Sequence, residues 1–143
     1  MRFTELVFTL WYLALIPFMP ATQEAKAAPG PNAPKEVEVT RLFSKDLPDF
    51  PGNEGLMITV DYPPGWSDPI HRHNADVFVY VLEGSIVMQV RGGERVTLTP
   101  GQTFYEGPDD VHVVGRSASD IKPANFLVVL VKKKGAPVQV PAK

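Results

Sequence analysis

Residues 65–84 read GWSDPIHRHNADVFVYVLEG and contain the strongest structural signal in the chain. His71 and His73 are separated by one residue, and side chains alternate along a strand, so both imidazoles would project from one face. The same parity places Val77 on that face and Asp76 on the opposite one. Two histidines in this spacing also occur on ordinary surface strands, so their meaning depends on the sequence around them.

Short runs of β-branched and aromatic residues lie on both sides of this stretch, separated by Gly, Pro and Asp clusters. The chain contains fifteen prolines, which argue against long helices. After the apolar run at residues 6–19, no long stretch shows apolar residues at the 3.6-residue spacing of an amphipathic helix. Many short strands predict a sandwich or a barrel, and no internal repeat is visible, so we expect one all-β domain. The predicted strands are 37–43, 56–62, 70–73, 77–82, 86–91, 95–98, 103–106, 111–115 and 125–131.

A second stretch, residues 100–112, reads PGQTFYEGPDDVH and ends on the third of only three histidines, His112. The chain contains no cysteine, which excludes disulfides, thiolate catalysis and thiolate metal sites. Any metal would therefore be held by nitrogen or oxygen, and neutral imidazole suits iron, zinc, manganese, nickel and copper.

The first stretch resembles the first motif of the cupin superfamily: Gly, five residues, His-x-His, three or four residues, Glu, six residues, Gly. The matching residues are Gly65, His71, His73 and Gly84. The resemblance to small single-domain barrels of the cupin 2 type implies a double-stranded β-helix, or jelly-roll, for residues 37–134.

The second stretch is similar to the second cupin motif, which reads Gly, five residues, Pro-x-Gly, two residues, His. Gly101 and His112 fit this spacing. The Pro and Gly of the motif are replaced by Gly107 and Asp109, and its final Asn position holds Arg116.

In cupins, the histidines of both motifs line the barrel and bind one divalent metal, which assigns His71, His73 and His112 by resemblance. The family's fourth ligand is the glutamate of the first motif, and that position is Val77 here. Three interpretations remain open: a three-histidine site with open positions, a replacement ligand, or a weakened or lost site. Among replacement ligands Glu106 is favoured over Tyr105.

The resemblance implies a small metal-dependent enzyme, with dioxygenase-like oxidation of a small organic molecule as the first expectation and isomerase or lyase chemistry behind it. Glu106 would act as general base or fourth ligand. The alternative is a non-catalytic protein that binds a small ligand or a metal, which the scarcity of other acid–base groups predicted to face the cavity favours. A metal-free sugar-nucleotide epimerase fits less well, because the predicted strands offer few phosphate-binding groups.

The chain begins with an apolar run at residues 6–19, LVFTLWYLALIPFM, followed by Ala25-Lys26-Ala27. This pattern predicts a signal peptide over 1–27 and a secreted or periplasmic protein with no stable membrane insertion after cleavage. A Pro/Gly/Ala tether at 28–36 would lead into the barrel, and residues 135–143 would form a C-terminal tail.

The 143 residues carry a formal net charge of −2, with 44% hydrophobic and 21% charged residues. These values are typical of one globular domain and do not favour a nucleic-acid partner. We expect a small-molecule ligand or substrate. Related cupins often pair through their sheets, so the resemblance also implies a homodimer.

Overall fold

The computed structural model describes residues 36–143, which contain ten strands and no helix. The expected signal peptide (1–27) and all but the last residue of the tether (28–36) lie outside these residues. No helix long and apolar enough to cross a membrane is found in the described part of the chain. The strands are β1 (Glu38–Asp46), β2 (Asn53–Tyr62), β3 (His71–Arg72), β4 (Ala75–Glu83), β5 (Ile86–Val90), β6 (Val96–Leu98), β7 (Thr103–Glu106), β8 (His112–Ser117), β9 (Ala124–Lys133) and β10 (Val140–Pro141).

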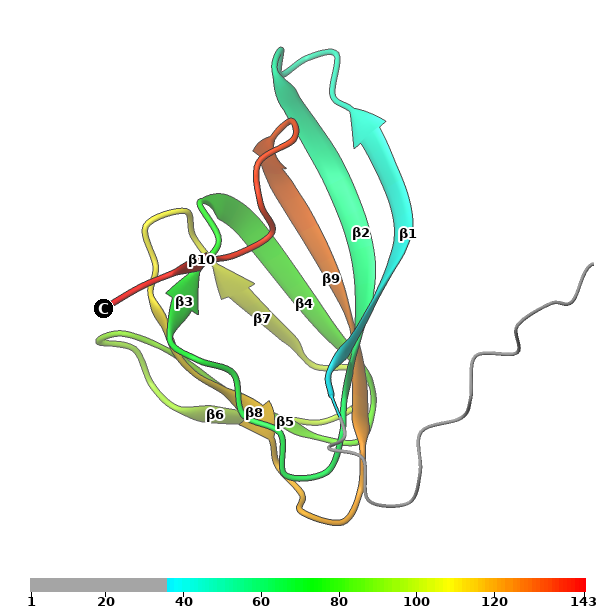
Figure 1. Cartoon of the computed structure of the whole chain (residues 1–143), viewed down its shortest axis with the longest axis vertical. Coiled ribbons are helices and arrows are strands. Elements are labelled where there is room, and N and C mark those ends of the chain that lie inside the picture. Colours follow the sequence, from blue (N-terminus) through cyan, green and yellow to red (C-terminus); the bar gives the residue numbers. More distant parts are fainter. Residues whose placement is uncertain (1–35) are drawn as a thin grey trace, which may run out of the picture. The chain divides into compact units, whose positions relative to one another are not determined.

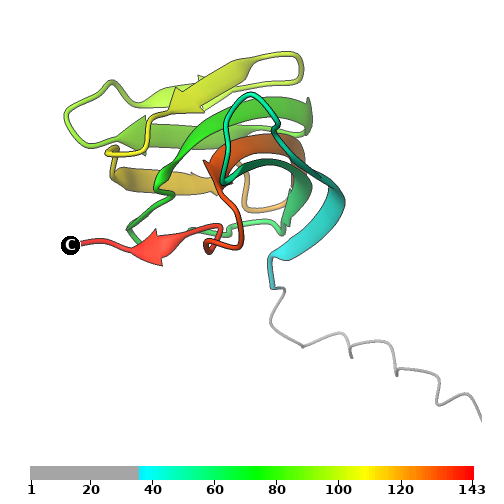
Figure 2. The ribbon, with the colours of Figure 1, turned by 90° about the horizontal axis from the view of Figure 1, so that it is seen from above.

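The strands form two five-stranded antiparallel sheets, which confirms the predicted all-β fold of the cupin type. Sheet A has the order β1-β2-β9-β4-β7, and sheet B has the order β10-β3-β8-β5-β6. Strands that are neighbours in a sheet are mostly distant in sequence, as in a jelly-roll. Figure 1 shows the two sheets facing each other, and Figure 2 shows from above how the chain curls around the interior.

The core lies between the inner faces of the two sheets. β2 and β9 each alternate buried and half-buried residues over most of their ten positions, as expected for strands with one face inside. Their register places Ile58 opposite Val128 and Leu56 opposite Leu130, so apolar side chains meet across the strands.

β4 shows the parity predicted from the sequence. Val77, Val79 and Val81 are buried, whereas Phe78 and Tyr80 are exposed on the outer face of sheet A. The three valines therefore belong to the inner wall of the barrel, and Val77 and Val79 line the same cavity as the histidines.

Each predicted strand overlaps an observed one, but β10 was not predicted. It has only two residues, Val140 and Pro141, and lies within residues 135–143, which the sequence suggested to be a tail. β10 pairs with β3, placing Pro141 opposite His71. A strand this short carries no periodic pattern, so only its pairing partner reveals it.

Candidate metal centre

His71 and His73 come from the same short segment, and backbone carbonyls orient both rings. The Nδ1–H of His71 donates to the Pro69 carbonyl at 2.8 Å, and the Nδ1–H of His73 donates to the Val138 carbonyl at 2.7 Å. A carbonyl oxygen can only accept, so each neutral ring carries its proton on Nδ1 and keeps a lone pair on Nε2.

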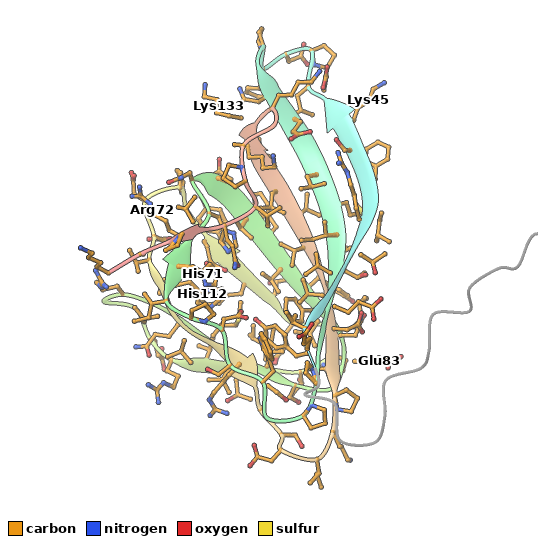
Figure 3. The ribbon with its side chains drawn as sticks, in the orientation of Figure 1. Lys45, His71, Arg72, Glu83, His112 and Lys133 are labelled. Atoms are coloured by element: carbon orange, nitrogen blue, oxygen red, sulfur yellow. The ribbon has the colours of Figure 1, made fainter. Side chains whose placement is uncertain are left out.

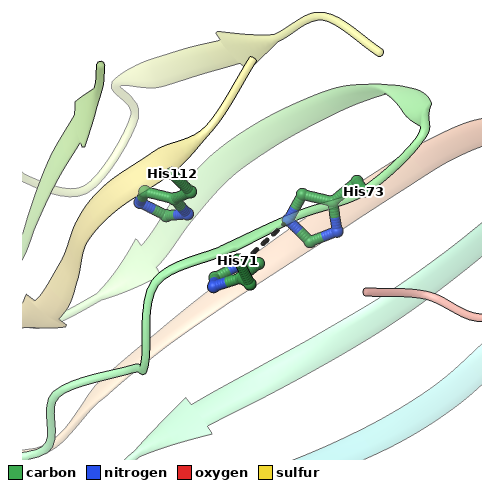
Figure 4. Close-up of side chains that lie close together, drawn as sticks. All are labelled: His71, His73 and His112. Atoms are coloured by element: carbon green, nitrogen blue, oxygen red, sulfur yellow. Dashed lines mark hydrogen bonds between the residues drawn. The ribbon is translucent and has the colours of Figure 1, made fainter. Parts of the chain in front are cut away.

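The two nitrogens that carry these lone pairs lie close together. The Nε2 atoms of His71 and His73 lie 3.2 Å apart, a contact drawn as a dashed line in Figure 4. In the tautomers that the carbonyls select, neither atom can donate a hydrogen bond to the other. Two nitrogens each about 2.0–2.1 Å from a tetrahedral zinc ion would lie about 3.3–3.4 Å apart, so this spacing is compatible with a shared cation.

His112 approaches the pair from β8, where it lies directly opposite His71. The ligand nitrogens of the three histidines all lie within 4.8 Å of one another, and His71 and His112 project into the barrel interior (Figure 3). Both ring nitrogens of His112 are buried without a hydrogen-bond partner. A Cβ on Gly115 would lie 2.8 Å from the His112 Cε1 atom, so only glycine leaves room for the ring.

Glu106 brings a carboxylate to the three histidines. Its Oε2 atom lies 3.3 Å from His112 Nδ1 and 3.7 Å from His73 Nε2. The side chain is 2% exposed, and Oε2 has no hydrogen-bond partner. A buried carboxylate oxygen and a buried imidazole without partners are costly, and a bound cation would satisfy both.

The register of sheet A explains how Glu106 reaches this position. Glu106 on β7 lies directly opposite Val77 on β4, and opposite residues of an antiparallel pair share a face. Val77 occupies the place of the motif's glutamate. The carboxylate is therefore supplied from the adjacent strand, at the level where the motif would have supplied it from β4.

Tyr105, the less favoured candidate ligand, lies on the opposite side of the sheet. It is 51% exposed, and its hydroxyl donates to the Asp76 carboxylate at 2.6 Å. The alternation along β7 turns Tyr105 outward where Glu106 turns inward, so Tyr105 is excluded from the group around the histidines.

The electrostatics of the pocket favour the neutral forms of His73 and His112. Burial, reinforced by neighbouring His71, lowers the pKa of His112 to about 4, and burial also lowers the pKa of His73. Burial raises the pKa of Glu106 to about 7, with a further contribution from Asp110. Neutral imidazoles are the form that binds metal, and a cation would favour the carboxylate that burial alone disfavours.

The histidines and Glu106 line a cavity of about 250 Å³ with mainly aliphatic walls. It also contains Tyr62, Trp66 and Asp68. The Asp68 carboxylate accepts a hydrogen bond from Trp66 Nε1 at 2.7 Å and another from the Tyr62 hydroxyl. Burial, together with the charge of Asp68, raises the pKa of Tyr62, so the phenol stays protonated and remains a donor.

Tyr62 and Asp68 are site residues that were not predicted from the sequence. Tyr62 lies on the inward parity of β2, which was a usable signal. Asp68 lies in the loop before β3, where no periodic pattern applies. Its backbone N–H donates to the Gly115 carbonyl at 2.8 Å, which ties the loop to the strand that carries His112. This long-range contact is not visible in the sequence.

The family model described as "Cupin domain" matches residues 58–130. No curated protein matches the chain. A solved structure of TT1209 from Thermus thermophilus is 27% identical, with a TM-score of 0.56 over 70% of this chain and 87% of that one. An uncharacterised double-stranded β-helix protein from Klebsiella pneumoniae is 15% identical, with a TM-score of 0.60 over 78% and 88% of the two chains.

The DMSP lyase DddQ from Ruegeria pomeroyi DSS-3 is also similar, at 22% identity and a TM-score of 0.54. The match covers 62% of this chain and 43% of the lyase chain, so it spans less than half of that protein. At these identities the similarity establishes the fold.

Proposed function

Because the chain belongs to the cupin domain family, we propose that it is a metal-dependent enzyme acting on a small organic molecule. Its divalent cation would be held by His71, His73, His112 and Glu106. The cavity that these residues line has mostly aliphatic walls, which suits a compact substrate with an apolar body.

The observation that carries this proposal is a cluster of potential metal-ligand atoms, some of them buried without a hydrogen-bond partner. Glu106 Oε2 and both ring nitrogens of His112 are buried without a hydrogen-bond partner, and the Nε2 atoms of His71 and His73 lie 3.2 Å apart beside them. Three imidazoles and one carboxylate are a donor set that zinc, manganese, iron, nickel and copper accept. Four protein ligands also leave positions open for substrate in a six-coordinate metal.

A bound cation would supply Lewis acidity, or redox chemistry with dioxygen if it is iron. The chain's own residues would do the rest. The Pro69 and Val138 carbonyls orient two ligands, and the aliphatic walls exclude water from the cavity. Tyr62 and Trp66 hold the Asp68 carboxylate at the cavity wall, where it can accept a proton from a bound substrate.

Metal content is the first test. Purified protein should contain a stoichiometric divalent metal, measured by elemental analysis after extraction with a weak chelator. His73→Ala should lose the metal, whereas Arg72→Ala, which changes the neighbouring exposed side chain, should keep it. Metal-free wild-type protein that takes up no zinc, iron or manganese on reconstitution would refute the site.

Two reaction classes compete, and oxygen dependence separates them. Dioxygenase-like oxidation predicts oxygen consumption by iron-loaded protein with a panel of phenols, thiols and diketones. Lyase or isomerase chemistry is the second candidate, because Asp68 and Tyr62 are acid–base groups that line the same cavity as the histidines. It predicts turnover without oxygen, with zinc or manganese, and loss of kcat in Asp68→Asn.

The non-catalytic alternative makes the same prediction for the metal but not for turnover. A passive binding protein would retain the metal and a ligand, detectable by mass spectrometry of native protein, and would show no product with any metal tested. The presence of Asp68 and Tyr62 at the cavity supplies the acid–base groups whose expected scarcity had favoured this alternative.

Export is proposed from the sequence of residues 1–27. Cell fractionation should recover the protein outside the cytoplasm, and mass spectrometry of the mature chain should find Ala28 at its N-terminus. A full-length chain retained in the cytoplasm would contradict this proposal.

We also propose that the protein pairs with a second copy of itself through the outer face of sheet A. An outer-face row of apolar side chains crosses all five strands of this sheet through consecutive register pairs. Its members are Phe43, Met57, Val129, Phe78 and Tyr105.

A further inference from the structure

The chain leaves β9 at one end of sheet A and crosses to sheet B through residues 135–141, which we call the strap (Figure 1). The strap ends in β10, whose residues pair with Arg72 and His71 on β3. Val138, in the middle of the strap, lines the cavity and provides the carbonyl that accepts the Nδ1–H of His73. One of the candidate ligands is therefore oriented by a segment 65 residues away in sequence.

A buried ion pair holds the start of the strap. Lys132 is 4% exposed, and its Nζ atom donates to Glu54 Oε1 and to the Ala136 carbonyl, both at 2.6 Å. Glu54 is 7% exposed, and the same Oε1 atom accepts the Gly135 N–H at 3.1 Å. The pair thus bonds the backbone of two consecutive strap residues, one through its cation and one through its anion.

A contribution to folding stability alone does not explain why Glu54 and Lys132 are buried as a charged pair. Burying two charges costs desolvation free energy, and replacing such a pair with apolar residues of similar volume is often neutral or stabilising. What apolar residues cannot do is bond an N–H and a carbonyl of the strap. The pair therefore does something apolar residues could not: its hydrogen bonds to Gly135 and Ala136 fix the direction in which the chain leaves sheet A.

We propose that the Glu54–Lys132 pair is a positioning device for the metal centre. By fixing the start of the strap, it holds the Val138 carbonyl against His73 and keeps the His73 Nε2 lone pair directed at the other ligands. The ring of His71 is oriented by the Pro69 carbonyl of its own loop and not by a strap carbonyl, although the His71 backbone pairs with β10. The inference rests on the proposed metal site, but its structural part concerns the metal-free protein.

The test compares wild-type protein with Glu54→Leu/Lys132→Met, which keeps the volume and removes both charges. Long-range ¹H–¹⁵N spectra of the histidine rings report which ring nitrogen is protonated. In metal-free protein we expect His73 to change from one tautomer to a mixture, while His71 keeps its proton on Nδ1. The melting temperature should stay near the wild-type value, because an apolar pair replaces the ion pair.

Lys134→Met is the matched control. Lys134 lies two residues further along, and its ion pair with Asp46 is exposed, with a 2.7 Å contact. Its side chain bonds Asp46 rather than the backbone of Gly135 or Ala136, so both histidine tautomers should remain as in wild type.

Zinc affinity, measured by competition with a chromogenic chelator, is the second readout. Groups that orient metal ligands typically contribute about 10–100-fold to affinity, so the double variant should bind zinc at least about tenfold more weakly. If wild-type protein binds no metal, the proposed function fails, yet the tautomer spectra still test the strap.

Pro137→Gly provides an independent variant should the double variant fail to fold. Pro137 is an exposed strap residue, and glycine there adds backbone freedom without disturbing the core. It should also broaden the His73 signals and spare those of His71. A folded double variant, or a folded Pro137→Gly, with wild-type His73 tautomer and zinc affinity would overturn the proposal.

Discussion

A carboxylate can move from one strand to its neighbour and still reach the same point, because opposite residues of an antiparallel pair have Cβ atoms only about 4.5–5.5 Å apart. Val77 and Glu106 are such a pair, and both face the interior. We expect Glu106→Gln to weaken zinc or cobalt binding at least about tenfold, since an amide lacks the charge of the carboxylate. Chelator competition measures this.

A swap of the two residues tests whether position on β4 or β7 matters. Val77→Glu/Glu106→Val should recover most of the affinity lost in Glu106→Gln, because it returns one carboxylate to the same inward-facing pair. Tyr105→Phe, on the outer face of the same strand, should bind metal as wild type does. Wild-type affinity in Glu106→Gln would show that the carboxylate is not a ligand.

Gly115 is the second residue on which the site depends. An added Cβ would lie 2.8 Å from His112 Cε1 and 3.1 Å from Asp68 Oδ2, so both side chains must shift. Gly115→Ala should lower the free energy of unfolding by about 1–3 kcal/mol and weaken metal binding. In Gly55→Ala, the new Cβ makes an ordinary 3.6 Å contact with Leu47, so this control should bind metal normally.

At the scale of single residues, the sequence predicted which side chains belong to the site better than it predicted their contacts with one another. The histidines could be named because their spacing follows strand parity and motif order. Glu106 could be named as a candidate, but its pairing with Val77 depends on a register between strands that no local pattern specifies. Asp68 was missed because its place beside His112 comes from a backbone contact between a loop and β8.

Among the elements, the turn after β4 requires a glycine for two reasons. Gly84 has φ of 69°, and a Cβ there would lie 2.3 Å from the Pro123 carbonyl oxygen. Gly84→Ala should therefore cost about 1–2 kcal/mol for the left-handed backbone and about 1–3 kcal/mol more for the clash. Urea denaturation of the two proteins gives the difference.

Gly52→Ala separates these two contributions. Gly52 has φ of 79°, and an added Cβ would have nothing within 4 Å, so only the backbone cost of about 1–2 kcal/mol applies. Equal destabilisation at both positions would mean that the backbone around Pro123 yields to the new methyl group.

The link between β2, β9 and the strap should give the protein a characteristic acid response. Hydrogen bonds, first from Lys132 and then from Ser44, lower the pKa of Glu54 from 4.5 to about 2. A carboxyl with a lower pKa in the folded state stabilises the fold fully above the unfolded pKa. This stabilisation should disappear as the pH falls from about 4.5 to about 2.

Denaturation at a series of pH values measures this response. The stability difference between wild type and Glu54→Leu/Lys132→Met should be constant above about pH 5 and should shift in favour of the variant as the pH approaches about 2. Parallel curves across this range would show that Glu54 titrates alike in the folded and unfolded chains.

Long strands could be predicted from the sequence more reliably than short ones. β2 and β9 span ten residues each with alternating burial, and the sequence predicted both. β3 and β10 have two residues each and exist because they pair with neighbours. The strap could not be predicted, since its course depends on the buried Glu54–Lys132 pair, whose members are 78 residues apart.

For the molecule as a whole, the outer face of sheet A is notable because it exposes aromatic side chains that a monomer would leave in contact with water. Phe78 is 49% exposed and Tyr105 51% exposed, and their ring centroids lie 5.3 Å apart within a row that crosses the sheet. Aromatic residues gathered on one face are typical of the core of a protein interface.

Charge at the ends of the adjacent register row favours a second copy as the partner. Lys45 on β1 and Asp76 on β4 occupy the two ends of this row, connected through Gly55 and Val131. A two-fold axis parallel to the strands would reverse the row, so Lys45 of each copy would face Asp76 of the other. Opposite charges placed this way fix the register of two stacked sheets.

We therefore expect light scattering to give wild-type protein about twice the mass of one chain, and Phe78→Glu to give a monomer, because a buried unpaired carboxylate opposes association. Lys45→Glu should weaken the dimer, and Lys45→Glu/Asp76→Lys should restore it. Ile121→Glu changes an 84% exposed residue outside the row and should leave the dimer intact.

A monomeric wild type at high concentration, or a dimer that persists in Phe78→Glu, would show that this face is not the dimer interface. Metal binding should survive in every one of these variants, since His71 and His112 lie on sheet B and Glu106 faces the interior from sheet A.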